Sequence, residues 1–287
     1  MKSASISLNN TQVSANGILT VWFAALPTSA LSGKSLNVKL FGDGNTCTGE
    51  ITGITAFKAG SAYSYAAILS SEGAEVEYVD LGLPSGLKWA TCNLGASSPE
   101  EYGDYYAWGE TETKTNYTEA TYKFYKSETV SEGGIDIEYK GYTKYIPSSK
   151  ASQYGFRGFY DDKPVLDPED DVAHAKLGGK WRMPTIAEIN ELQNNCQCDW
   201  VTYKGVKGRK FTSKKSGYTD KWIFLPAAGC RRYDYLSLVG SYGLYWSSSL
   251  STGNPSSAYY RYFYSDYVDT SSGYHRYNGL SVRPVSE

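Results

Sequence analysis

Alternating apolar and polar residues dominate the chain from Ser5 to Leu69. Short runs of this kind are typical of half-buried β-strands, and turn residues such as Gly42-Asp43-Gly44-Asn45 separate them. The pattern predicts strands at residues 5–8, 18–23, 35–41, 50–54 and 62–68. We therefore expect a small all-β module at residues 1–74.

A polar stretch at residues 70–75 follows and is typical of a linker between domains. Beyond it the composition shifts toward Trp, Tyr and Gly, with many turn residues and few strong helix patterns. A chain of 287 residues also exceeds the usual size of one domain. We expect a second domain at residues 75–287, with an irregular α+β fold and long loops.

One segment of this second domain carries helix signals around a group of acids. Asp167 is a capping residue, Pro168 suits a first helical turn, and the acids that follow favour a helix N-terminus. The pattern predicts a helix from Pro168 to Leu177, which Gly178-Gly179 should end.

A second helix is predicted directly after Thr185. Thr185 and Glu188 form a capping box, and apolar residues follow at helical spacing through Glu191. The expected buried side of this helix holds Ile186, Ile189 and Leu192.

Apolar runs predict strands at residues 221–226, 245–249, 258–265 and 279–284. Alternation in the third of these strands places Ala258, Tyr260, Tyr262 and Tyr264 on one face, which we expect to be the more exposed. Phe263 lies on the other face and is the expected core residue.

Charge and hydropathy exclude several classes of partner. The formal net charge of −2 gives no basic field that would attract nucleic acid or an anionic membrane. No apolar run reaches the length of a membrane span, and residues 21–26 are too short and too late for a signal peptide. The five cysteines lack metal-finger spacing, so we expect most of them to be free thiols.

Four motifs of the second domain carry a family resemblance. They are Val79-Asp80-Leu81-Gly82-Leu83-Pro84-Ser85-Gly86-Leu87-Lys88-Trp89-Ala90, Tyr102-Gly103-Asp104-Tyr105-Tyr106-Ala107-Trp108-Gly109-Glu110, Gly179-Lys180-Trp181-Arg182-Met183-Pro184-Thr185 and Gly279-Leu280-Ser281-Val282-Arg283-Pro284-Val285. Over residues 78–287 the chain resembles the C-type-lectin-like major paralogous domain of Bacteroidetes surface proteins. The resemblance implies a C-type-lectin-like fold and a place at the cell surface or outside the cell.

The first domain carries a resemblance of its own. Its motifs are Phe23-Ala24-Ala25-Leu26-Pro27, Leu31-Ser32-Gly33-Lys34-Ser35-Leu36 and Phe57-Lys58-Ala59-Gly60-Ser61-Ala62-Tyr63-Ser64-Tyr65. They resemble the closing strands of fimbrillin-like (Mfa-type) pilus or adhesin modules. The resemblance implies a fimbrillin-like sandwich, complete or truncated, and assembly partners in a pilus or on the surface.

The tail at residues 229–285 is similar to that of variable proteins diversified by retroelements. Such elements randomise adenines, and an Asn codon changed in this way cannot become Lys, Glu, Gln, Met or Trp. Residues 229–285 contain no Lys, Glu, Gln or Met, and their single Trp, Trp246, lies in a motif that should be fixed. A fixed tail of Tyr-rich strands and loops would also avoid these residues.

The same tail holds much of the tyrosine that sets this chain apart, which has 27 Tyr against 9 Phe. Tyr gives contact area at low entropic cost, and Ser, Asn and Gly fill the gaps between rings. The candidate contact residues are Tyr233, Asp234, Tyr235, Ser237, Tyr242, Ser256, Ser257, Tyr260, Tyr262, Tyr264, Asp266, Tyr267, Ser271, Ser272, Tyr274, His275 and Tyr277. The expected scaffold residues are Trp181, Trp222, Trp246, Gly279, Val282 and Pro284.

The sequence gives little support for an enzymatic activity. Arg182-Met183-Pro184-Thr185 also resembles a motif of formylglycine-generating enzymes, which need a cysteine pair near the C-terminus. Cys230 is the only cysteine after Cys198, which disfavours that oxidase. His174 and His275 lie far apart and lack partners at ligand spacing. We expect no catalytic residue and no cofactor.

Metal binding has one candidate, the acids Asp167, Glu169, Asp170 and Asp171, whose oxygens suit Ca²⁺. Helix capping explains them as well. Sugar-binding C-type lectins use Glu-Pro-Asn or Gln-Pro-Asp with Trp-Asn-Asp, whereas this tail offers only Gly253-Asn254-Pro255 and a Trp246 that Ser247 follows. We expect no metal site, which leaves stacking of sugars on Tyr open.

Together these observations predict a ligand-binding surface protein, whose Tyr- and Ser-rich tail is diversified and contacts a protein or a glycan. The alternative from a different class is a pilus or adhesin subunit with a fixed tail that serves assembly.

Overall fold

The computed structural model describes residues 36–42, 45–51, 70–72, 76–269 and 272–287, with the side chains of residues 76–269 and 273–287. The chain folds as two compact units. One comprises Met1–Phe41 and Cys47–Ser70, and the other comprises Gly42–Thr46 and Ser71–Glu287.

A three-stranded sheet is described before residue 76. It consists of β1 (Leu36–Gly42), β2 (Asn45–Ile51) and β3 (Ser70–Glu72), in the order β1-β2-β3. β1 confirms the strand expected at residues 35–41, whereas β2 begins well before the one expected at 50–54. The linker prediction is wrong where β3 forms. The residues of β3 are all polar, so they lack the alternation of apolar and polar residues that predicts a strand. The strands expected at residues 5–8, 18–23 and 62–68 lie outside the described residues.

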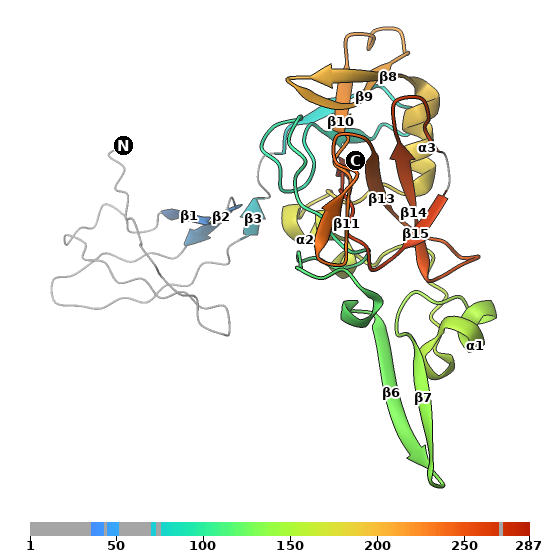
Figure 1. Ribbon diagram of the computed structural model, residues 1–287. Coiled ribbons are helices and arrows are strands. Elements are labelled where there is room, and N and C mark those ends of the chain that lie inside the picture. The colour runs from blue at the N-terminus through green and yellow to red at the C-terminus, as the bar shows by residue number, and fades with distance from the viewer. Residues whose placement is uncertain (1–35, 43–44, 52–69, 73–75, 270–271) are drawn as a thin grey trace, which may run out of the picture. The chain divides into compact units, whose positions relative to one another are not determined.

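The C-terminal unit is built from small antiparallel sheets (Figure 1). Its strands are β4 (Tyr78–Asp80), β5 (Lys88–Ala90), β6 (Tyr125–Glu132), β7 (Ile135–Tyr142), β8 (Cys196–Tyr203), β9 (Val206–Ser213), β10 (Trp222–Pro226), β11 (Cys230–Arg232), β12 (Tyr235–Ser237), β13 (Gly243–Leu250), β14 (Ser257–Phe263), β15 (Ser272–His275) and β16 (Val285–Ser286). They form sheets in the orders β10-β9-β8, β13-β14-β15, β16-β5-β4, β11-β12 and β6-β7.

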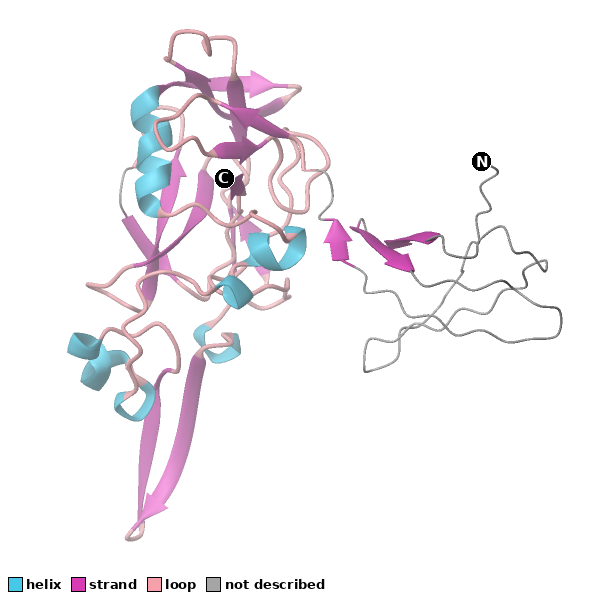
Figure 2. Ribbon diagram, turned by 180° about the vertical axis from the view of Figure 1, so that it is seen from behind, coloured by secondary structure: helices cyan, strands magenta, loops and turns pink. Residues whose placement is uncertain are grey.

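Helices are few and short in the described residues, as Figure 2 shows. They are η1 (Glu119–Thr121), η2 (Ser148–Lys150), α1 (Ala151–Tyr154), η3 (Phe156–Gly158), η4 (Pro168–Asp170), α2 (Val172–Leu177) and α3 (Ile186–Asn195). Strands account for 38% of the structure and helices for 15%. The α+β prediction, with its C-type-lectin-like C-terminal domain, is therefore wrong: the fold is mainly β. Much of the domain in which we expected long loops pairs as short strands instead.

The acid-rich helix signal gives two elements in place of one. Pro168–Asp170 forms a single 3₁₀ turn, and the α-helix begins only at Val172. Asp171, and not Asp167, is the cap of α2, because its carboxylate accepts hydrogen bonds from the backbone N–H groups of Ala173 (2.9 Å) and His174 (3.1 Å). The predicted end at Gly178 is confirmed, with φ at 65°.

The second helix follows its capping box. In α3 the Thr185 hydroxyl accepts the Glu188 N–H, and the Glu188 carboxylate accepts the Thr185 N–H at 2.7 Å. Ile189 and Leu192 are buried as predicted. The helix continues to Asn195, beyond the predicted last residue.

Three of the four predicted C-terminal strands are confirmed as β10, β13 and β14. The strand expected at residues 279–284 is instead a series of isolated bridges, in which Gly279, Leu280 and Ser281 pair with three different segments. β13 is buried at every position, and its Trp246 donates from Nε1 to the Tyr106 carbonyl at 2.8 Å. Trp246 is therefore part of the scaffold, as predicted.

The other expected scaffold residues divide into two groups. Gly279, Val282 and Pro284 are buried, in agreement with that prediction. Trp181 and Trp222 are only half-buried.

Buried arginines hold the end of the chain on the body of the unit. Arg283 donates to the Asn93 side chain (2.8 and 3.0 Å) and to the Phe224 carbonyl at 2.9 Å. Arg276 lies 4.1 Å from the centre of the Tyr142 ring and donates to the Lys144 carbonyl at 3.1 Å. Hydrogen bonds thus replace the water that the buried Arg283 guanidinium loses, whereas the Arg276 guanidinium is surrounded mainly by the rings of Trp108, Tyr122 and Tyr142.

Candidate ligand-binding surface

The central strand β14 places three candidate tyrosines side by side. Its register with β15 pairs Ala258 with Tyr274, and alternation places Tyr260 and Tyr262 on the same face. The Tyr260 ring lies 5.8 Å from the Tyr262 ring, at an interplanar angle of 19°, and 5.1 Å from the Tyr274 ring. These separations lie in the range of offset-stacked aromatic pairs.

The stack continues beyond the end of β14. The Tyr264 N–H donates to the Tyr267 carbonyl at 3.0 Å, which turns the chain and sets the two rings 5.7 Å apart. Tyr262 lies 6.4 Å from Tyr264 and 5.8 Å from Tyr267, and Tyr242 lies 5.2 Å from Tyr264. We call these six residues the tyrosine ladder: Tyr242, Tyr260, Tyr262, Tyr264, Tyr267 and Tyr274.

Exposure increases from one end of the ladder to the other. Tyr260 is 7% exposed, whereas Tyr267 is 45% exposed and the other four rings are half-buried. The prediction that Ala258 and Tyr260 belong to an exposed face is therefore wrong. The Tyr260 ring is packed between rings of the two neighbouring strands, with Trp246 of β13 at 6.2 Å and Tyr274 of β15 at 5.1 Å.

The opposite face of β14 anchors the ladder. Phe263 is fully buried, as predicted, and stacks on Tyr245 at 5.9 Å and 17°. Arg261 is also buried and donates to the Asn190 side chain at 2.7 Å and to the Gln193 side chain, both on α3. The tyrosine ladder thus lies on one face of β14, and the other face of this strand packs against α3.

A second group of candidates lies on the β11–β12 hairpin. Arg232 pairs with Tyr235, and Tyr233 adopts a positive φ of 53° at the turn between the strands. The Tyr233 and Tyr235 rings are exposed and stack at 6.1 Å. The exposed large apolar residues of this hairpin and of the turn after it are Tyr233, Tyr235, Leu236, Leu238 and Val239, which we call the hairpin patch.

Sequence reasoning missed three residues of the hairpin patch. Leu236, Leu238 and Val239 are not among the contact residues predicted from the sequence, yet all three are exposed. The signal that was available is their position between Tyr233 and Gly240, in a run too short and too turn-rich to form a buried strand. Exposed apolar residues that adjoin one another are typical of interaction sites.

Two contacts join the hairpin patch to the tyrosine ladder. The Tyr242 N–H donates to the Leu238 carbonyl at 3.0 Å, so the outer ladder begins directly behind the patch. The Arg232 guanidinium lies over the Tyr274 ring at 5.2 Å and donates to its hydroxyl. Burial raises the pKa of Tyr274 to about 12, so its hydroxyl is neutral at physiological pH. The hairpin that carries the patch therefore lies next to the ladder.

The remaining candidates are more scattered. Asp234, Asp266 and His275 are exposed, and His275 stacks on the half-buried Tyr277 at 5.1 Å. Ser237 and Ser256 are half-buried, whereas Ser257 is buried and is poorly placed to contact a ligand. Ser272 belongs to β15, and Ser271 lies outside the described residues.

Residues 229–285 contain no Lys or Glu, and this holds for their buried and their exposed positions alike. Much of this window is buried, and buried positions rarely hold either residue. Its exposed positions lack them as well, although Lys and Glu are frequent on the rest of the surface. Protein interfaces are likewise depleted in Lys and Glu and enriched in Tyr and Arg.

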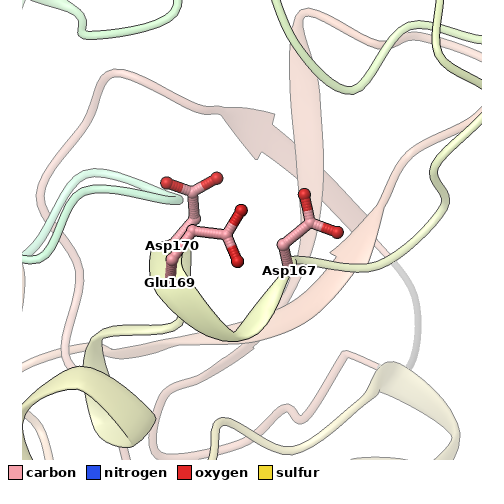
Figure 3. Close-up of side chains that lie close together, drawn as sticks. All are labelled: Asp167, Glu169 and Asp170. Atoms are coloured by element: carbon pink, nitrogen blue, oxygen red, sulfur yellow. The ribbon is translucent and has the colours of Figure 1, made fainter.

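The acidic cluster near α2 is arranged around lysines. Figure 3 shows that Asp167, Glu169 and Asp170 lie close together. The Lys144 ammonium reaches all three carboxylates, at 2.7 Å from Asp167, 3.3 Å from Glu169 and 2.5 Å from Asp170. Burial opposes ionisation of Asp170, but hydrogen bonds from Lys123 and Lys144 lower its pKa below the usual value. The three carboxylates thus bind the Lys144 ammonium of the chain itself, and this contact accounts for their arrangement without Ca²⁺.

A cavity of about 350 Å³ lies beside α2, and none of the ladder residues lines it. Its lining includes Asp171, His174, Trp181 and Arg182. Asp171 caps α2, His174 Nδ1 lies 3.2 Å from the Trp181 carbonyl, and Arg182 forms a two-pronged ion pair with Glu188. These polar side chains serve the fold.

Four cysteines lie in the described residues as free thiols: Cys92, Cys196, Cys198 and Cys230. Burial raises the pKa of Cys196 to about 11, so its reactive thiolate is scarce at neutral pH. Among the helices of the described residues, none has the length and apolar character needed to cross a membrane.

Residues 200–285 match a family described as a domain of unknown function, DUF8237. No curated protein and no solved structure matched the chain. The matched segment contains every residue of the tyrosine ladder and of the hairpin patch. It also contains β9, β10 and β13, which hold those residues in place.

Proposed function

We propose that this chain is a ligand-binding protein, and that the tyrosine ladder and the hairpin patch together form its contact surface. The observation that carries the proposal is the continuity of the ladder. Its rings stack from the buried Tyr260 to the exposed Tyr267, and the patch adjoins it through Tyr242 and Tyr274.

Such a surface suits binding for two physical reasons. Stacked rings have already lost much of their rotational freedom, so a ligand that covers them incurs little further loss of entropy. Each tyrosine also offers a hydroxyl beside its apolar ring, and the patch adds aliphatic area that water solvates poorly. Binding then rests on shape and hydrogen-bond complementarity, without covalent chemistry or a cofactor.

The partner in this proposal is a protein or a glycan. The chain's net charge of −2 argues against a polyanion. The N-terminal module would attach the protein to a pilus or another surface assembly, so that the ligand is met at the cell surface or outside the cell. That placement rests on the family resemblances of both domains.

We further propose that a retroelement diversifies this surface. The exposed positions of residues 229–285 lack the residues that adenine randomisation cannot produce. The scaffold of this surface is buried, because Arg261 and Phe263 lie on the opposite face of β14 and Trp246 packs against the inner ring Tyr260. An exchange of Tyr233 or Tyr267 would leave those packing contacts intact.

The proposal can be tested on arrays of glycans and of extracellular proteins. Ligands bound by the unaltered protein are compared with those bound by a Tyr235→Ser/Tyr267→Ser variant. Tyr160→Ser is the matched control, because Tyr160 is 57% exposed and lies outside the surface. We expect the double variant to lose at least about tenfold in affinity, as for residues central to an interface, and the control to bind normally. Equal binding by all three proteins would contradict the proposal.

A further inference from the structure

A two-stranded ribbon extends from the C-terminal unit, formed by β6 and β7 (Figures 1 and 2). The strands pair along their whole length, from Tyr125 with Tyr142 to Glu132 with Ile135. Gly133 and Gly134 connect them with φ values of 61° and 84°. Two consecutive positive φ values define the tight turn that matches strand twist, and they explain the Gly-Gly pair.

The two faces of the ribbon differ in chemistry. Paired residues of antiparallel strands project to the same side. One face carries Thr129 with Glu138 and Ser131 with Asp136, and is polar. The other carries Val130 with Ile137 and Glu132 with Ile135, and is largely apolar toward the tip.

Among the described residues, neighbouring side chains cover the base of the apolar face, and Val130 farther along it is half-buried. At the base the Lys126 ammonium lies 4.8 Å from the Phe156 ring, and the Arg157 guanidinium lies 4.5 Å from the Tyr139 ring. Phe156 and Arg157 belong to η3, which lies against the ribbon at this level. Beyond it, Ile135 is 68% exposed and Ile137 is 36% exposed.

The outer ribbon also has a one-sided charge. Residues 127–139 contain no Lys or Arg, and their acids are Glu128, Glu132, Asp136 and Glu138. Glu128 pairs with Lys126 and Arg157, and Glu138 pairs with Lys140. No ion pair of the described residues includes Glu132 or Asp136. The tip is therefore both apolar and negatively charged.

A lone ribbon with exposed isoleucines is unfavourable unless something covers it, because two-stranded hairpins are marginally stable in water. A second copy of this chain is a poor occupant, since its acids would face these acids. We infer that the outer half of the β6–β7 ribbon is a docking arm for a protein segment in which apolar residues alternate with Lys or Arg. Such a strand, added along an edge of the ribbon, would place its apolar side chains beside Val130, Ile135 and Ile137 on one face and its cations beside Asp136 on the other.

This arm lies outside residues 229–285, so it is independent of the proposed ligand surface. Its partner would be constant while the tyrosine surface varies. The two proposals can therefore fail separately.

The inference is tested with a fluorescent peptide of alternating lysine and valine, whose binding to the whole chain is followed by anisotropy. A peptide of alternating glutamate and valine is the matched probe. We expect the lysine peptide to bind at least about tenfold more tightly, since carboxylates repel the other. An Ile135→Thr/Ile137→Thr variant, which keeps β-branched residues in the strand, should lose about tenfold in affinity for the lysine peptide.

Two control variants isolate the face. Thr129→Ser, on the polar face, and Tyr235→Ser/Tyr267→Ser, in the proposed ligand surface, should bind the lysine peptide normally. The inference is overturned if the lysine peptide does not bind, if both peptides bind equally, or if the isoleucine variant binds as the unaltered protein does. It is also overturned if sedimentation reveals a dimer that the isoleucine variant lacks, because the occupant would then be a second copy.

Discussion

Replacement of single rings by alanine should separate the two ends of the tyrosine ladder. Tyr260→Ala removes a ring that is 7% exposed, whereas Tyr267→Ala removes one that is 45% exposed. Both residues belong to the same stack, so they differ mainly in burial. We expect the first change to affect folding and the second to affect binding alone.

The magnitude follows from the contacts of Tyr260. Its ring lies 5.1 Å from Tyr274, 5.8 Å from Tyr262 and 6.2 Å from Trp246. Truncation of a buried aromatic residue lowers the free energy of unfolding by about 3 kcal/mol or more, because area is lost and a cavity forms. For a unit of this size that corresponds to a fall of roughly 6–12 °C in Tm. Tyr267→Ala should cost about 0.5 kcal/mol or less, as is usual for surface changes.

Thermal unfolding followed by tryptophan fluorescence measures the difference, since Trp246 lies at the inner end of the ladder. Tyr160→Ala serves as the exposed control. The reasoning is refuted if Tyr260→Ala melts with the unaltered protein, or if Tyr267→Ala lowers Tm as much as Tyr260→Ala does.

Three further predictions concern packing, metal binding and pH. Gly243→Ala should lower the free energy of unfolding by about 1–3 kcal/mol, because the new Cβ would overlap the Phe263 ring. Addition of Phe263→Leu to this variant should restore part of the lost stability, as measured by denaturant titration. Millimolar Ca²⁺ should leave Tm unchanged, because Lys123, Lys144 and Lys163 already pair with the acidic cluster, and a rise that Asp170→Asn abolishes would contradict this. The pKa of Asp170 is lowered from its ordinary 3.8, so its contribution to stability is complete above that pH and is lost as pH falls through the lowered value. Asp170→Asn should therefore flatten the fall in Tm below about pH 4.

The positions of several helices and strands could be predicted from short stretches of sequence. The Thr185 and Glu188 capping box located the start of α3, and apolar runs located β10, β13 and β14. These elements are specified by residues adjacent in sequence. The error at Asp167 has the same origin, because several acids in a row offer several caps, and only packing against Met183 selects Asp171, which accepts the Met183 N–H at 2.8 Å.

The fold class and the exposure of the tyrosines depend on residues far apart in sequence. Alternation in β14 identified which side chains share a face, and Phe263 as core. It could not show that Trp246 and Tyr274, from the strands on either side of β14, pack around Tyr260 and bury it. Strands as short as β4, β5 and β16 leave little periodicity, so they are absent from the predicted strands, and the mainly β character of the fold was missed.

The most direct test of an exchangeable surface on a fixed scaffold is to sequence the gene, with its genomic neighbourhood, from many cells of one lineage. We predict a near-copy of the DNA for residues 229–285 beside a reverse transcriptase gene, with differences only where the copy has adenine. Substitutions should fall in the codons of exposed residues such as Tyr233 and Tyr267 and spare those of Trp246 and Phe263. An identical tail in every cell, or changes that fall as often in the buried codons, would contradict the account.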